Sequence, residues 1–201
     1  MTTSRLEAFS DGVFAIAATL LVLELHVPAV GSGALWPQLL EQWPSYFGYL
    51  VSFLTIGIIW VNHHALFALV KRVDRPILFL NLLLLLVVSV IPFPTALLGQ
   101  WIVDAQQGPV AAAILGCVYL LMGLTFGGIW FYAFLHHELA RPDVDRSAAR
   151  ASIPRFTIGN AVYVLGIGLA FVSPVISLAV YLLVAVYYVF PTLPQPQAEK
   201  D

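Results

Sequence analysis

Long apolar stretches alternate with short polar connections along almost the whole chain. Most are near the roughly 20 residues that an α-helix needs to cross a bilayer. They are Leu6–Val27, Pro44–Val70, Pro76–Gln100, Pro109–Leu135, Pro154–Val172 and Val175–Phe190. The pattern predicts an all-α bundle of six transmembrane helices, one domain over residues 1–190, followed by a disordered tail, 191–201, that contains three prolines.

Prolines mark where these helices should begin and bend. Four of them precede or open an apolar stretch, where a missing N–H is least costly: Pro44, Pro76, Pro109 and Pro154. Pro92 and Pro94 fall late in the third stretch and should kink or stop that helix. Ser173-Pro174 leaves only a tight turn between the last two helices, which are therefore expected to form an antiparallel hairpin.

Composition supports a membrane domain and excludes other classes. Of the 201 residues, 60% are hydrophobic and 10% are charged, against roughly 45–50% and 25% in a soluble domain. The net charge of −2 provides no broad basic field, so nucleic acid is not expected as a partner. The single cysteine, Cys117, excludes an intrachain disulfide framework.

The basic residues predict the orientation in the membrane. Six alternating helices place every Lys and Arg on one side: Arg5, Lys71, Arg72, Arg75, Arg141, Arg146, Arg150, Arg155 and Lys200. The two longer connections on the other side, 28–43 and 101–108, contain neither residue type. By the positive-inside rule, a multi-pass protein of the cell membrane with cytoplasmic N- and C-termini is expected.

Asp11 is the most unusual residue of the first helix, because an ionisable group within a membrane span suggests function. It lies about 9 Å deeper than Arg5 along the helix. Polar side chains on other helices reach a similar depth: Asn62, His63, His64, Asn81 and Asn160, with Trp60 as a further donor. This polar layer could be structural, or it could form a proton relay or cation site in which His63 or His64 partners Asp11. A transition-metal site is disfavoured, because adjacent histidines point about 100° apart on a helix.

An apolar stripe runs along the rest of the first helix. Ile16, Leu20 and Leu23 recur at i, i+4 and i+7, and Thr19 adjoins them. By itself such a stripe indicates either ordinary packing or a pore lining.

The beginning of the chain resembles the transmembrane protein 175 family of potassium channels. The shared signature is Arg-x-x-x-Phe-Ser-Asp, present as Arg5, Phe9, Ser10 and Asp11. The Gly12–Glu24 run and the segment from Trp60 to His64 are also similar to that family.

The resemblance implies a homotetramer with one six-helix unit per chain, whose four first helices surround a pore for potassium and other monovalent cations. It implies that Ile16, Leu20 and Leu23 form a hydrophobic constriction in place of a carbonyl selectivity filter, and that Thr19 contributes to potassium preference. The signature residues and the polar layer would support the pore helix within the lipid bilayer. Glu24 would either concentrate cations at the outer mouth or be an ordinary interfacial carboxylate. No cofactor or metal other than the permeant potassium ion is implied.

Two rival functions remain at this stage. One is a proton-coupled secondary transporter that uses the Asp and His layer, although no inverted halves or paired broken helices are evident. The other is a non-conducting membrane assembly subunit. An enzyme is not expected, because the sequence offers no set of nucleophile, base and orienting group.

Overall fold

The computed structural model describes residues 3–31, 33–136, 138–142 and 146–190. The tail expected to be disordered, 191–201, lies outside these residues. The helices are α1 (Thr3–Leu20), the 3₁₀-helix η1 (Leu21–Glu24), α2 (Leu35–Glu41), α3 (Trp43–Ala68), α4 (Arg75–Val90), α5 (Pro92–Trp101), α6 (Gly108–Leu135), α7 (Arg146–Ala170) and α8 (Pro174–Val189). The described ranges contain no strand, only one isolated bridge between Val70 and Ala140.

Several of these helices are long and apolar enough to cross a membrane. Within the described ranges, four segments meet that criterion: Thr3–Glu24, Trp43–Ala68, Arg75–Trp101 and Gly108–Leu135. Two shorter apolar helices, Phe156–Ala170 and Pro174–Val189, follow them. The chain therefore has the all-helical architecture of a membrane protein.

The prolines account for some of the helix boundaries but not for all of them. The third predicted stretch is broken at Ile91, immediately before Pro92, into α4 and α5. The hairpin between α7 and α8 is also confirmed, and Ser173 caps α8 by accepting a hydrogen bond from the Ile176 N–H. The expectation that a helix begins at Pro154 is wrong, because α7 begins at Arg146 and contains that proline in its interior.

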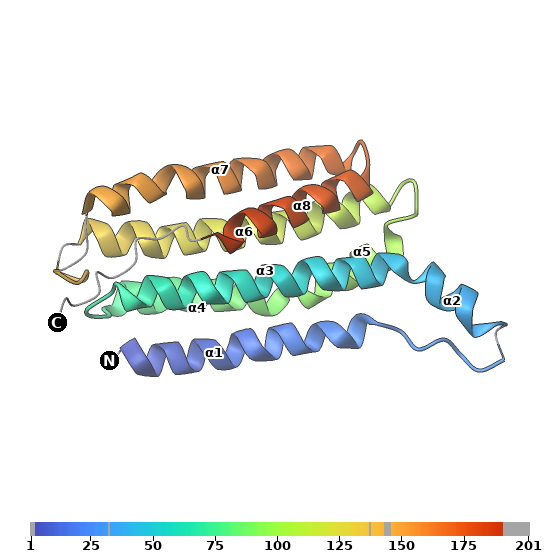
Figure 1. Ribbon diagram of the computed structural model, residues 1–201, viewed down its shortest axis with the longest axis horizontal. Coiled ribbons are helices and arrows are strands. Elements are labelled where there is room, and N and C mark those ends of the chain that lie inside the picture. Colours follow the sequence, from blue (N-terminus) through green and yellow to red (C-terminus); the bar gives the residue numbers. More distant parts are fainter. Residues whose placement is uncertain (1–2, 32, 137, 143–145, 191–201) are drawn as a thin grey trace.

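The short helix α2 was not foreseen within the connection 28–43. It projects beyond one end of the bundle, while the start of α1 lies at the opposite end (Figure 1). The turn between α3 and α4 and residues 138–142, which follow α6, lie at the same end as the start of α1 (Figure 1). Arg5, Lys71, Arg72, Arg75 and Arg141 belong to these segments, so the described basic side chains gather at one end.

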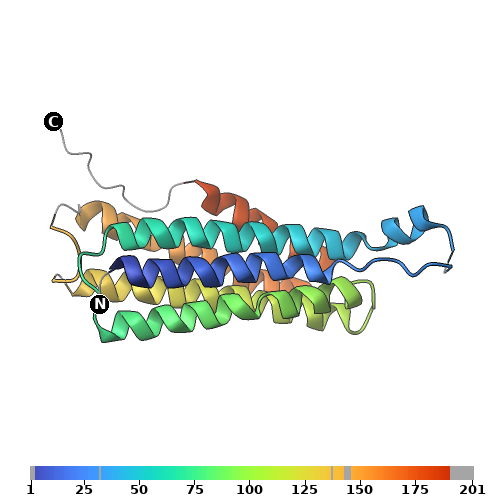
Figure 2. The ribbon, with the colours of Figure 1, turned by 90° about the horizontal axis from the view of Figure 1, so that it is seen from below.

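Helix α1 lies along one edge of the bundle, and α7 lies at the opposite edge (Figure 1). Seen from below, α1 runs between α3 and α4 (Figure 2), and it contacts both helices. The side of α1 that faces away from the bundle is left uncovered within the subunit.

Close packing joins the other helices. Tyr181 of α8 is fully buried against Gly116 of α6, and its hydroxyl donates a hydrogen bond to the carbonyl of Ala112, 3.2 Å away. A methyl group at position 116 would collide with the tyrosine ring. The hydroxyl of Ser52 lies 2.7 Å from those of Thr95 and Tyr119, which ties α3 to α5 and α6. These contacts join α3, α5, α6 and α8 into a closely packed group of helices, and α1 lies along one edge of the bundle that they form.

Candidate pore helix and its polar anchor

The buried face of α1 follows the helical repeat. Leu6, Ser10, Phe14 and Ala17 of α1 and Leu21 at the start of η1 are each at most 3% exposed. Their spacing of three or four residues places them on one side of the helix, against α3 and α4. Ser10 and Ala17 are small, which allows the neighbouring helices to approach closely.

The opposite side of the same helix carries the apolar stripe. The exposed fraction is 61% for Ile16, 42% for Leu20 and 70% for Leu23. These large side chains therefore contribute little to packing within the subunit. In a bilayer they must face either lipid or another protein chain.

Thr19 lies on this uncovered side, with its hydroxyl turned back onto the helix. Its Oγ1 is 2.9 Å from the carbonyl oxygens of both Ala15 and Ile16. Because the hydroxyl hydrogen is directed at the backbone, the oxygen lone pairs are left as acceptors. Such an oxygen is a suitable ligand for a cation.

Asp11 is held by a tryptophan and not by a histidine. The indole Nε1 of Trp60 on α3 donates a hydrogen bond of 2.8 Å to Oδ1 of Asp11. The expectation that His63 or His64 would partner this carboxylate is therefore wrong. The sequence supplied the indole as a donor at the right depth, but the choice among donors depends on how α1 and α3 are rotated about their axes.

A second chain of hydrogen bonds runs behind Asp11 into the bundle. The amide nitrogen of Asn81 on α4 donates to Ser10 Oγ over 3.0 Å, and the Asn81 oxygen is 2.8 Å from His63 Nε2. Ser10 in turn donates to the carbonyl of Leu6. All three polar side chains are at most 2% exposed, so α1, α3 and α4 are linked by a buried polar network.

Two aromatic rings pack against His63. The Phe14 ring packs edge-on with a centroid distance of 5.3 Å, and the Phe67 ring lies 4.6 Å away. These rings and the hydrogen bond with Asn81 fix the imidazole in place. Phe14 was not among the residues expected to take part, because an aromatic within an apolar run gives no signal of a polar neighbour.

The adjacent histidine points elsewhere. His64 Nδ1 lies 3.6 Å from Glu7 Oε2 of α1, and the His64 side chain is 69% exposed. Glu7 was not singled out from the sequence, although it lies one turn before Asp11. The other signature side chains, Arg5 and Phe9, are exposed on α1.

Two of the expected members of the polar layer lie in a different part of the bundle. Asn62 and Asn160 line a pocket between α3, α6, α7 and α8, and the Asn62 amide nitrogen donates to the carbonyl of Ile58. The expectation of a single layer at one depth is therefore corrected. Equal depth does not bring side chains together when their helices present them to different neighbours.

Glu24 is a carboxylate at the end of this segment that lies far from Arg5. It is half-buried in the last turn of η1. In the part of the chain that the structure describes, no three His, Cys, Asp or Glu residues are grouped so that they could hold a metal ion.

Comparison with known proteins connects this arrangement to channels. A family model described as "Endosomal/lysosomal potassium channel TMEM175" matches residues 5–92. A potassium channel of Streptomyces collinus is 50% identical over 198 residues, which are 98% of this chain and 96% of the relative. The crystal structure of a lysosomal potassium-selective channel TMEM175 homolog from Chamaesiphon minutus is 39% identical, covers 94% of this chain and 97% of that one, and superposes with a TM-score of 0.85.

Animal relatives are longer. The human protein named endosomal/lysosomal proton channel TMEM175 is 32% identical over 155 residues, which are 72% of this chain but 31% of the human one. The region of similarity therefore spans less than a third of that relative.

Proposed function

Since the chain belongs to the TMEM175 family of ion channels, we propose that it is a potassium-permeable cation channel of the cell membrane, formed by four identical subunits. In this proposal the uncovered sides of four α1 helices face one another around a central axis. The observation that carries it is the exposure of Ile16 and Leu23 on a helix whose other side is fully packed. Burial between subunits gives these side chains a partner that the single chain lacks.

The proposed constriction consists of rings of Ile16, Leu20 and Leu23. Four aliphatic side chains around an axis leave a narrow apolar throat, which cannot replace the hydration shell of an ion. Conduction therefore requires the throat to widen enough for partly hydrated ions to pass. Because no carbonyl cage is involved, preference among cations depends on the few oxygens that the helix supplies.

Thr19 and Glu24 supply oxygens on the proposed permeation path. The Thr19 hydroxyl already donates to its own helix, so four such oxygens would act as acceptors for a potassium ion between the apolar rings. Glu24, beyond the last ring, would raise the local cation concentration at the outer mouth.

The proposed topology is six membrane crossings, with α4 and α5 acting as one. It places the end that carries Arg5, Lys71 and Arg72 in the cytoplasm, by the positive-inside rule, and α2 on the outer side. Both termini are then cytoplasmic.

In this proposal the polar network holds α1 in a fixed position against α3 and α4. A pore helix that contacts its subunit on one side needs attachment on that side, and interhelical hydrogen bonds contribute to it. The arrangement favours a structural role over the proton-coupled transporter, because the buried histidine is bonded to Asn81 and the carboxylate to Trp60.

The proposal is tested by flux from potassium-loaded liposomes that contain the purified channel. Ile16→Asn places an amide in the proposed throat and should increase potassium flux, because a polar ring is wetted more readily than an apolar one. The matched control is Ile158→Asn on α7, where the isoleucine is 52% exposed on a helix outside the proposed pore. Unchanged flux for Ile16→Asn in an intact tetramer, or a monomeric channel, would rule out the proposed pore.

A further inference from the structure

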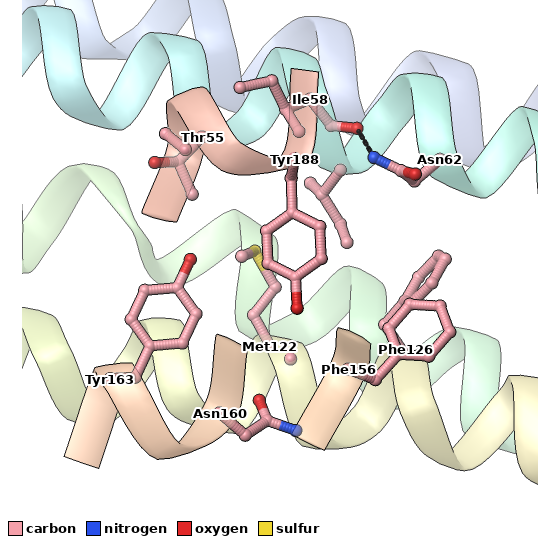
Figure 3. Close-up of a pocket in the computed structure, with 12 residues that line it drawn as sticks. Thr55, Ile58, Asn62, Met122, Phe126, Phe156, Asn160, Tyr163 and Tyr188 are labelled. Carbon is pink, nitrogen blue, oxygen red and sulfur yellow. Dashed lines mark hydrogen bonds between the residues drawn. The ribbon is translucent and has the colours of Figure 1, made fainter. Parts of the chain in front are cut away.

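A small pocket lies away from α1, where α3, α6, α7 and α8 meet (Figure 3). It encloses about 40 Å³, room for about three water molecules at roughly 10–15 Å³ each. Its walls are mainly apolar, from Ile58, Ile59, Met122, Phe126, Phe156 and Ala185. Most of its polar groups come from one turn of α7 and from α8.

Two of those polar groups have no hydrogen-bond partner in the part of the chain that the structure describes. Asn160 and Tyr163, three residues apart on α7, both line the pocket (Figure 3). Among the described residues, nothing forms a hydrogen bond with the Asn160 carboxamide or the Tyr163 hydroxyl. Tyr163 is only 4% exposed. Asn160 is half-buried, and both groups border the pocket, so each can form a hydrogen bond with a molecule inside it.

Glycines provide the room for the polar groups. The Asn160 oxygen lies directly over Gly123 of α6, where an added methyl group would collide with it. The Tyr188 hydroxyl lies in the same way over Gly159. The polar edge of the pocket therefore depends on the absence of side chains at two positions.

We propose that this pocket binds a small uncharged alcohol. One hydroxyl can accept from the Asn160 amide and donate to its oxygen or to Tyr163, while a short alkyl chain covers Phe126 and Met122. Water alone would complete the polar groups but would leave the aromatic and aliphatic walls hydrated. The size of the cavity limits the ligand to about four heavy atoms by the same volume per site.

The pocket also borders the helix that holds α1. The pocket residues on α3 are Ile58, Ile59 and Asn62. They are close in sequence to Trp60 and His63, whose hydrogen bonds link α3 to Asp11 and Asn81. A bound alcohol would therefore contact the helix to which the pore helix is attached.

Binding is tested with 2-bromoethanol soaked into crystals of the whole channel, located by the anomalous signal of bromine. One peak per subunit is expected in the pocket. Ala185→Leu fills the space and should abolish the peak, whereas Gly168→Leu, at an open position on α7, should retain it. Density for water only in the unmodified protein, or a peak that survives Ala185→Leu, would overturn the assignment.

A measurement in solution tests whether the Tyr163 hydroxyl forms a hydrogen bond with the alcohol or whether the cavity holds the alcohol by shape alone. Tyr163→Phe keeps the ring and removes the hydroxyl, so the dissociation constant of 2-fluoroethanol, followed by fluorine NMR in detergent, should rise about 3–10-fold. An unchanged constant would overturn the role of Tyr163. Both experiments measure binding alone, so their outcome does not depend on whether the protein conducts potassium.

Discussion

The indole nitrogen of Trp60 lies 2.8 Å from the Asp11 carboxylate, which joins the proposed pore helix to α3. The bond forms about halfway along α1, on a turn that also carries Ser10 on its packed side. Asp11 thus acts on one neighbouring helix and Ser10, through Asn81, on another. The helix is fixed in rotation by two bonds that point in different directions.

Trp60→Phe should weaken this attachment. The side chain stays aromatic although it becomes smaller, and the hydrogen bond to Asp11 is lost, at a cost of about 1–2 kcal/mol. Thermal unfolding of the purified protein, with gel filtration to measure the fraction assembled into the proposed tetramer, should show lower stability. Trp101→Phe is the control, since Trp101 is 43% exposed against 44% for Trp60. Equal unfolding temperatures for the two variants would contradict the role of the bond.

Asp11→Ala should impair assembly more than ion preference. It removes the carboxylate that Trp60 binds but none of the side chains proposed to line the pore. The assembled fraction should fall, while the potassium-to-sodium flux ratio of the channels that still assemble stays the same. A fully assembled variant with normal currents would contradict this expectation.

Asn81→Leu should be more harmful than its nearly conserved volume suggests. Asn81 donates to Ser10 and contacts His63, so its removal leaves two buried polar groups without that partner. Each such group costs about 1–3 kcal/mol. Denaturant unfolding should show the loss, whereas Gln100→Leu at an exposed position of α5 should change stability by less than about 0.5 kcal/mol. Similar free energies of unfolding for the two variants would show that the polar network does not stabilise the fold.

Thr19→Ala should reduce the preference for potassium over sodium. One hydroxyl oxygen per subunit is lost from the proposed path, and a contact worth about 0.5–1.5 kcal/mol corresponds to a change of roughly 2–13-fold in the flux ratio. Ser89→Ala is the control, because Ser89 is an exposed hydroxyl of α4 that also bonds within its own turn. If both variants keep the ratio of the unmodified channel, Thr19 does not contact the ion.

Two glycines of α6 should respond in opposite ways to the same substitution. Gly116→Ala brings a methyl group into the Tyr181 ring and should destabilise the fold by about 1–3 kcal/mol. Gly128→Ala meets no atom within 4 Å, and alanine is the better helix former, so stability should rise by up to about 1 kcal/mol. Thermal unfolding of both variants in the same detergent tests the difference in sign.

Much of the helical arrangement could be predicted from hydropathy, because each apolar stretch is long and the prolines mark several boundaries. The break before Pro92 and the hairpin at Ser173 are examples. The internal position of Pro154 could not be predicted, since a proline is tolerated both at a helix start and, with one hydrogen bond lost, within a helix. Helix α2 was missed because its seven residues are too few to show a helical repeat of apolar positions.

The sequence could predict which residues belong to the candidate site, but not which of them form hydrogen bonds with each other. Depth along each helix follows from the rise per residue, which brought Trp60, His63 and Asn81 to the level of Asp11. The rotation of each helix about its own axis depends on tertiary packing. Because of that rotation, Asp11 lies beside Trp60, whereas Asn160 lines a separate pocket. The exposure of Ile16 likewise depends on which neighbours α1 has.

The one-sided packing of α1 separates two kinds of selection on its sequence. Substitutions at Leu6 or Phe14 disturb a filled interior and are purged because the subunit misfolds. Substitutions at Ile16 or Leu23 disturb almost nothing within the chain, so they are filtered only through what the assembled protein does. Lineages can therefore diversify along this stripe at little cost to folding.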